Sequence, residues 1–131
     1  MARWSDVERL ALALPETAEG RSRDLRVWQV KGKTFVWDRP LRPKEVKALG
    51  DAAPDGPILA VWVEDLGVKE ALLADDPEVY FTTSHFDDYA IVLARLERLG
   101  AEELCELIVE AWFARAPKRL AKQYAESALE D

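Results

Sequence analysis

The last third of the chain holds the pattern that most constrains its fold. Two short runs rich in aromatic and aliphatic residues, 79–83 and 89–96, flank a polar turn, and such runs favour β-strands. From residue 101 to residue 116, apolar side chains recur every three or four positions, which is typical of one face of an α-helix. Two neighbouring strands followed by an amphipathic helix indicate a sheet with a helix packed on its face.

The N-terminal segment predicts a helix followed by a loop. Ser5 and Glu8 have the spacing of a capping box, in which Ser5 would be the N-cap and Glu8 would reach back to its backbone. Apolar residues follow at helical spacing and the helix is expected to stop before Pro15. Residues 16–24 are polar, and we expect them to form a loop.

A tight hairpin is predicted next. Residues 25–30 and 34–38 are two β-rich runs, and Gly32 between them can supply the positive φ that a tight turn requires. Because side chains alternate along a strand, Phe35 and Trp37 are expected to share one face of the second strand.

The middle of the chain predicts a short helix, a central strand and a second helix. The short helix is expected over residues 44–49, and the nearly continuous apolar run 58–63 is expected to be a central strand whose Trp62 faces the helical layer. Asp65 is a suitable N-cap for a helix over residues 66–74. At the C-terminal end, residues 118–131 favour a helix but have a weaker apolar pattern.

These elements predict a two-layer α+β fold in the order α-β-β-β-α-β-β-α. Antiparallel strands joined by short turns favour helices packed on one face of a single sheet. The other face would stay partly open and available to partners. A chain of 131 residues can bury a core without cross-links, so residues 1–131 are expected to form one domain.

Composition favours a cytoplasmic protein. Cys105 is the only cysteine, so the chain cannot form an internal disulfide. The first residues do not resemble a signal peptide, and no run approaches the roughly 20 apolar residues of a membrane span, so no membrane partner is expected. The oligomeric state is left open.

Charge is distributed unevenly along the chain. The formal net charge is −7, which disfavours a simple nucleic-acid binder. Residues 21–47 nevertheless hold nine basic and three acidic residues, a net charge of +6, so the rest of the chain carries −13. This segment would either form a positive face on an acidic body or simply keep turns and edge strands solvated.

The basic residues supply a candidate nucleic-acid surface. Lys31 and Lys33 would sit at a hairpin tip, where they could contact phosphates with salt-dependent and sequence-independent affinity. The alternative for the hairpin is that its lysines only keep the turn solvated. For the cations near residue 118, the alternative is that they complement the dipole at the C-terminal end of a helix. The full candidate set is Lys31, Lys33, Arg39, Arg42, Lys44, Lys47, Lys118 and Arg119.

The turn between the last two strands is a second candidate site. His85 is the only histidine, and with Asp87 and Tyr89 it could contact a ligand, although adjacent acids in a turn commonly cap backbone amides. The chain has no glycine-rich phosphate loop, no zinc-ligand spacing and no nucleophile motif. We therefore expect no metal, no cofactor and no enzymatic activity.

Several motifs in this order resemble those of the MmcQ/YjbR-like family. They are Leu14-Pro15, Gly32-Lys33 followed by Phe35 and Trp37, Glu70-Ala71-Leu72-Leu73-Ala74-Asp75-Asp76-Pro77, His85-Phe86-Asp87-Asp88-Tyr89, Leu93-Ala94-Arg95-Leu96, Ala111-Trp112 and Ala116-Pro117-Lys118-Arg119-Leu120. The chain departs from many relatives where Arg23-Asp24-Leu25 replaces Gly-His-Pro, and where Asp88 replaces a glycine.

The resemblance implies a CyaY-like α+β fold, often described as a double-wing DNA-binding fold. It therefore implies a non-enzymatic protein that binds DNA through its basic hairpin. The alternative is a module that binds a protein or a small ligand with the open sheet face and the His85 turn, without nucleic acid. The acidic charge of the chain favours the alternative, whereas the family resemblance and the +6 segment favour DNA.

Overall fold

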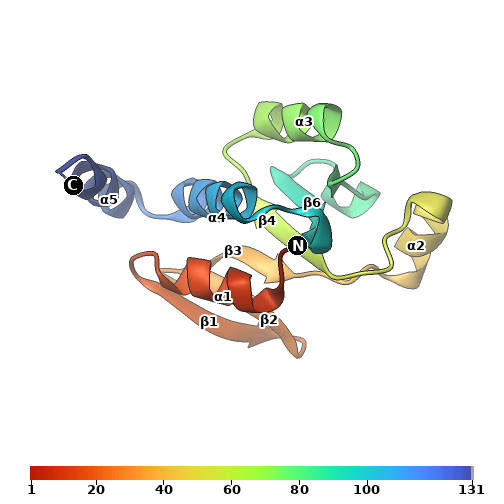
Figure 1. Ribbon diagram of the computed structural model, residues 1–131, viewed down its shortest axis with the longest axis horizontal. Helices are drawn as coiled ribbons and strands as arrows, with labels where there is room; N and C mark the ends of the chain where they lie inside the picture. Colours follow the sequence, from red (N-terminus) through yellow and green to blue (C-terminus); the bar gives the residue numbers. More distant parts are fainter. Residues whose placement is uncertain (131) are drawn as a thin grey trace.

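The computed structural model describes the backbone of residues 1–130 and the side chains of residues 1–127. Figure 1 shows an α+β architecture in which helices pack on an antiparallel sheet, as the sequence predicts. The sheet has six strands, one more than predicted. The strand order is β1-β2-β3-β4-β6-β5. The strands are β1 (Thr17–Ser22), β2 (Leu25–Val30), β3 (Lys33–Asp38), β4 (Ile58–Trp62), β5 (Tyr80–Phe81) and β6 (Ile91–Arg95).

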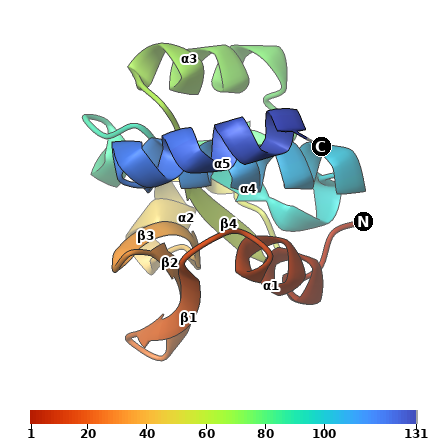
Figure 2. The same cartoon turned by 90° about the vertical axis from the view of Figure 1, so that its left-hand side faces the viewer.

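Five α-helices and three short 3₁₀ turns join these strands in the described part of the chain. The helices are α1 (Trp4–Leu12), α2 (Pro43–Leu49), α3 (Leu66–Asp75), α4 (Ala101–Arg115) and α5 (Lys118–Glu130). The 3₁₀ turns are η1 (Gly50–Ala52), η2 (Ser84–Phe86) and η3 (Leu96–Arg98). Helix α4 lies between α1 and α3 in both views (Figures 1 and 2).

The larger core lies between the sheet and helices α1 and α4. Trp28 of β2 and Trp112 of α4 are both fully buried in it, and Val7 and Ala11 bring α1 onto the same cluster. The Trp112 indole donates a hydrogen bond to the carbonyl oxygen of Pro15 (3.0 Å), so the ring also holds the chain that leaves α1.

The opposite face of the sheet is covered at one end only. A smaller cluster there includes Phe81, Phe86 and Leu93, and Leu41 and Leu49 pack against it from α2 and the segment before it. Helix α2 projects from the body at one end of the molecule (Figure 1). The remainder of this face has no helix over it among the described residues, which agrees with the predicted open face.

The N-cap of α1 differs from the prediction. The helix begins at Trp4 with Arg3 as its N-cap, and Asp6 accepts a hydrogen bond from the Arg3 backbone N–H at 2.9 Å. The acid three residues after the cap is thus Asp6 rather than Glu8, because Arg3 is the residue with extended backbone (φ −131°).

Strand β1 corrects the prediction that residues 16–24 form a loop. Its six residues pair with β2 from Thr17↔Val30 to Ser22↔Leu25. The strand lies at the edge of the sheet and most of its side chains are exposed, so no apolar alternation marks it in the sequence. Arg23 and Asp24 connect the two strands with φ of 52° and 65°, the left-handed values of a two-residue type I′ hairpin.

A β-bulge corrects the predicted orientation of Phe35. The β2–β3 pairing steps from Trp28↔Val36 to Gln29↔Thr34, so Phe35 is an extra residue on β3. Phe35 and Val36 are therefore both buried in the core beneath the helices, whereas Trp37 faces the opposite side. Phe35 and Trp37 do not share a face.

Candidate functional site

The open face of the sheet contains a hollow of about 930 Å³. Its floor is apolar and aromatic, because Val27 pairs with Trp37, Trp62 pairs with Ile91, and all four side chains line the hollow. Trp62 thus lies on the face opposite the main helical layer, contrary to the prediction from its place in an apolar run. Consecutive residues of β4 face opposite sides, and Val61 is the one beneath the helices.

Cations surround this floor. Five basic side chains line the hollow together with one carboxylate among the described residues, Asp38. The basic residues are Arg23, Lys33, Arg39, Arg42 and Arg115. Burial raises the pKa of Asp38, with the charge of Arg26 acting in the opposite direction. The hollow is thus a cationic surface on a chain of net charge −7.

Arg115 is held against the floor by two contacts. Its guanidinium carbon lies 4.3 Å from the centre of the Trp62 ring, and its Nε donates a hydrogen bond to the Thr34 carbonyl oxygen at 3.2 Å. Arg115 is the last residue of α4, so the helix ends where its side chain can reach the end of β4 and the start of β3. No acceptor for its Nη groups occurs among the side chains that the structure describes.

An ion pair forms another side of the hollow. Arg39, only 8% exposed, donates from Nη1 and Nη2 to the two carboxylate oxygens of Glu45, both at 2.9 Å. Burial raises the pKa of Glu45, but hydrogen bonds from Arg39, from the Arg42 backbone N–H and from Thr83 outweigh this effect and hold the pKa at about 2. The carboxylate therefore fastens α2 both to the end of β3 and to the segment after β5.

Lys69 positions the turn that carries His85. This buried side chain of α3 donates hydrogen bonds to the carbonyl oxygens of Phe86 (2.6 Å) and Tyr89 (2.9 Å). Burial lowers the pKa of Lys69, and the charges of Asp87 and Asp88 oppose that shift. His85 packs edge-on against Phe86 with ring centres 4.8 Å apart, and both rings line the hollow.

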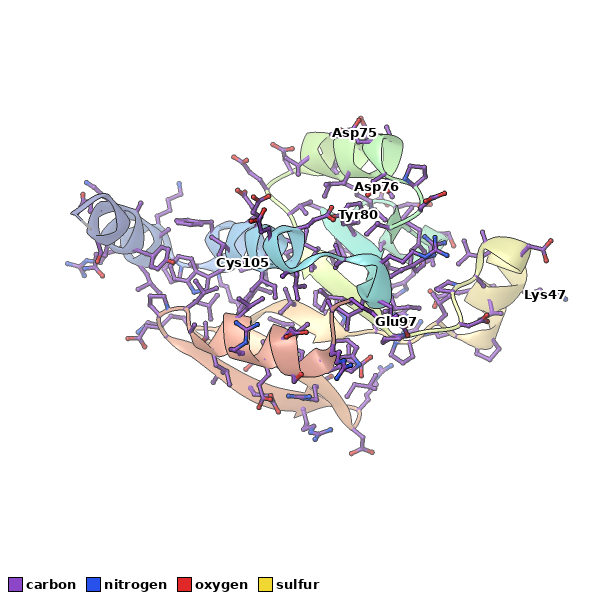
Figure 3. All side chains as sticks on the ribbon, viewed as in Figure 1. Lys47, Asp75, Asp76, Tyr80, Glu97 and Cys105 are labelled. Carbon is purple, nitrogen blue, oxygen red and sulfur yellow. The ribbon has the colours of Figure 1, made fainter. Side chains whose placement is uncertain are left out.

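The structure separates the predicted nucleic-acid residues into three groups. Lys33, Arg39 and Arg42 line the hollow, although Arg39 is already paired with Glu45. Lys31 is at the hairpin tip, 3.5 Å from a carboxylate oxygen of Glu16. The others are exposed away from the hollow: Lys44 and Lys47 on α2, and Lys118 and Arg119 at the start of α5. Figure 3 shows Lys47 at the outer side of α2.

The predicted ligand-contact residues are also divided. His85 lines the hollow, whereas Asp87 and Tyr89 are exposed outside it, and Tyr89 precedes β6 instead of starting it. Arg23 and Arg115 were not among the predicted site residues. Arg115 belongs to the cluster of cations near residue 118, but no local signal places it beside Trp62 and Thr34, because both are distant in the sequence.

The described part of the chain contains neither a metal-ligand cluster nor a candidate membrane-spanning helix. No group of three or more His, Cys, Asp or Glu side chains is arranged to hold a metal ion there. None of the described helices has the length and apolar character needed to cross a membrane.

Comparison with known proteins identifies the family. The family model described as YjbR matches residues 12–114. Uncharacterised proteins of Mycobacterium bovis and of two strains of Mycobacterium tuberculosis are each 48% identical over 127 residues, which cover 95% of this chain and 96% of theirs. A crystal structure of a Deinococcus radiodurans protein with a DUF419 domain has a TM-score of 0.67 at 19% identity, covering 95% of this chain and 89% of that one, and shows the same fold. The resemblance seen in the sequence is thereby confirmed, and the chain belongs to the YjbR family.

Proposed function

We propose that this protein is a non-enzymatic nucleic-acid-binding protein whose binding surface is the hollow on the open face of the sheet. The observation that supports it is the lining of that hollow, where five basic side chains and one carboxylate surround two tryptophans. Cations beside aromatic rings are the combination that nucleic-acid surfaces use for phosphates and bases. The acidic remainder of the chain would direct a polyanion toward this one face.

This proposal moves the contact from the hairpin tip to the sheet. Lys33 lies in the hollow, but Lys31 has Glu16 beside it and Arg39 is occupied by Glu45. Among the described residues, the rim cations without a salt-bridge partner include Lys33 at the start of β3, and Arg23 and Arg42 near the other end of that strand. We also place the protein in the cytoplasm and its fold in the CyaY-like group, on the basis of the single cysteine and of the antiparallel sheet with one open face.

Charge reversal in the hollow tests the proposal. Binding of a fluorescently labelled oligonucleotide is measured by anisotropy over a series of salt concentrations. The double variant Lys33→Glu, Arg42→Glu is expected to bind at least tenfold more weakly, and removing two phosphate contacts should reduce the slope of log K against log[salt] by about 1.4.

The matched control is Lys118→Glu, Arg119→Glu, which reverses the same number of charges at exposed positions on α5. It should bind much as the wild type does. Equal losses in the two double variants would contradict a site in the hollow, and no binding by the wild type at low salt would contradict nucleic-acid binding altogether.

The second candidate is a module for a small anionic ligand. It is favoured by the size of the hollow, which lies within the roughly 300–1,000 Å³ typical of small-molecule sites. His85 and Phe86 would then be part of the contact surface. Saturable binding of a mononucleotide with no gain for longer strands would favour this candidate.

A further inference from the structure

We propose that the hollow takes single-stranded nucleic acid in preference to duplex, and that an unpaired base stacks on the guanidinium of Arg115. This inference rests on the proposed nucleic-acid function and adds the class of ligand and the residue that selects it.

The Arg115 guanidinium is a fixed, flat platform. Trp62 lies beneath it at 4.3 Å, and the hydrogen bond from Nε to Thr34 restricts its rotation. Arg115 and Trp62 both line the hollow, so a ligand bound there can reach the guanidinium. A planar cation held over an indole ring is a suitable surface for a nucleobase, which is itself flat and polarizable.

The floor matches exposed bases better than it matches a phosphate backbone alone. Val27, Trp37 and Ile91 present apolar and aromatic surface between the cations of the rim. A duplex keeps its bases stacked inside and offers mainly phosphates, which would not use such a floor. A single strand offers flat rings and phosphates together, so rings could lie on the floor while Lys33 and Arg42 reach the phosphates.

The hollow is large enough to hold a nucleotide or a short piece of a strand. A volume of about 930 Å³ is on the scale of small-molecule sites and would hold only a short piece of a strand. A free nucleotide has the same ring and phosphate chemistry, so it must be separated from a strand by experiment. Inorganic phosphate lacks the ring altogether.

The first experiment compares four probes with the wild-type protein at low salt. They are a labelled single-stranded 12-mer, the same sequence as a duplex, an abasic 12-mer of the same length, and a mononucleotide used as competitor. The base-containing single strand is expected to bind about tenfold more tightly than the duplex and the abasic strand, because stacking acts only on exposed bases. The mononucleotide should compete only at much higher concentration.

The second experiment replaces Arg115 without removing its charge. Lysine keeps the positive charge but lacks the planar surface, so Arg115→Lys should weaken binding of the single strand about tenfold and leave binding of the abasic strand unchanged. Arg119→Lys, at an exposed position of α5, is the matched control and should bind both strands normally. Thermal midpoints of both variants show whether the fold is intact.

A third measurement needs no variant. Stacking beside Trp62 and Trp37 should quench tryptophan fluorescence on addition of the single strand and leave it unchanged on addition of the abasic strand. Equal affinity for the base-containing and abasic strands would overturn the stacking inference while leaving nucleic-acid binding in place. Tighter binding of the duplex would overturn the preference for single strands, and no binding of any probe would overturn both proposals.

Discussion

Arg39 shows how a single contact removes a cation from a binding surface. It belongs to the basic segment of the sequence and lines the hollow, yet both of its Nη atoms donate hydrogen bonds to the Glu45 carboxylate. Its guanidinium carbon lies 5.2 Å from the centre of the Phe86 ring. Its charge is therefore neutralised inside the protein. The remaining cations of the hollow, among them Arg115, differ because no carboxylate partner for them occurs among the described residues.

Glu45→Gln tests the role of this ion pair at the residue scale. The substitution removes the negative charge and one acceptor from a group that Arg39, Arg42 and Thr83 all contact, so the free energy of unfolding at pH 7 should fall by about 2 kcal/mol. Urea denaturation followed by tryptophan fluorescence measures this loss. Lys44→Gln, one position away and exposed, is the control and should change stability little.

The same group predicts a dependence of stability on pH. The pKa of Glu45 is about 2 in the folded protein and 4.5 in its ordinary state, so the unfolded chain takes up this proton first. Its contribution is complete above about pH 4.5 and is lost as the pH falls toward 2. The difference in unfolding free energy between wild type and Glu45→Gln should therefore shrink over that interval. A difference that stays constant down to pH 2.5 would contradict the assignment.

At the scale of elements, α3 and the η2 turn are joined by one buried amine. Lys69 donates to two backbone carbonyls of the segment that carries His85 and Phe86, so the helix determines where these two rings stand. Helix α3 is itself fixed at its start, because Asp65 accepts a hydrogen bond from the Val68 N–H at 2.9 Å, as predicted from the sequence. One wall of the hollow thus depends on a helix that does not line it.

Lys69→Met should loosen that wall. Methionine fills a similar volume but leaves the carbonyl groups of Phe86 and Tyr89 without their donor, at a cost of about 1–3 kcal/mol. Amide hydrogen exchange in residues 84–90 should become faster, whereas exchange in β2 and β3 should not. Glu70→Gln, the exposed neighbour on α3, is the control. Unchanged exchange in the turn would show that Lys69 does not position it.

Asp65→Ala tests the start of the same helix. Loss of the N-cap acceptor should lower the free energy of unfolding by about 1 kcal/mol, because the Val68 N–H is left without its partner. Asp65→Asn retains an acceptor and should have a smaller effect. Thermal or urea midpoints of the two variants give the comparison, and equal losses would indicate that charge rather than capping matters here.

At the scale of the whole molecule, the charge of the chain is opposite to that of its open face. The net charge of −7 would repel a polyanion from most of the surface, while the hollow offers Arg23, Lys33 and Arg42 without a salt-bridge partner among the described side chains. Affinity for nucleic acid should then depend strongly on salt and come from few contacts.

This charge arrangement predicts a measurable salt dependence. Three phosphate contacts on a single strand correspond to a slope of log K against log[salt] of about −2, so affinity should fall about twentyfold between 50 and 200 mM salt. Anisotropy titrations at four or five salt concentrations measure the slope. A slope near zero would mean that the rim cations do not contact phosphates, and a slope several times steeper would require cations outside the hollow.

The sequence alone determined those features of this protein that arise from near neighbours along the chain. The helix periodicity of α4, the N-cap at Asp65, the hairpin at Gly32 and the apolar run of β4 all depend on residues a few positions apart, so their patterns predict them directly. The family followed from the same kind of local motifs in a fixed order.

The tertiary structure alone decided which residues meet. Edge strand β1 has no large apolar side chain and forms only because β2 pairs with it, and the bulge that turns Phe35 into the core is a property of the β2–β3 pairing. Arg115 lies over the ring of Trp62, and Lys69 donates a hydrogen bond to the carbonyl of Phe86. In both pairs the partners are far apart in the sequence, so no local pattern predicts the contact. The candidate site consists almost entirely of such contacts, because a hollow forms where segments distant in the sequence come together in the fold.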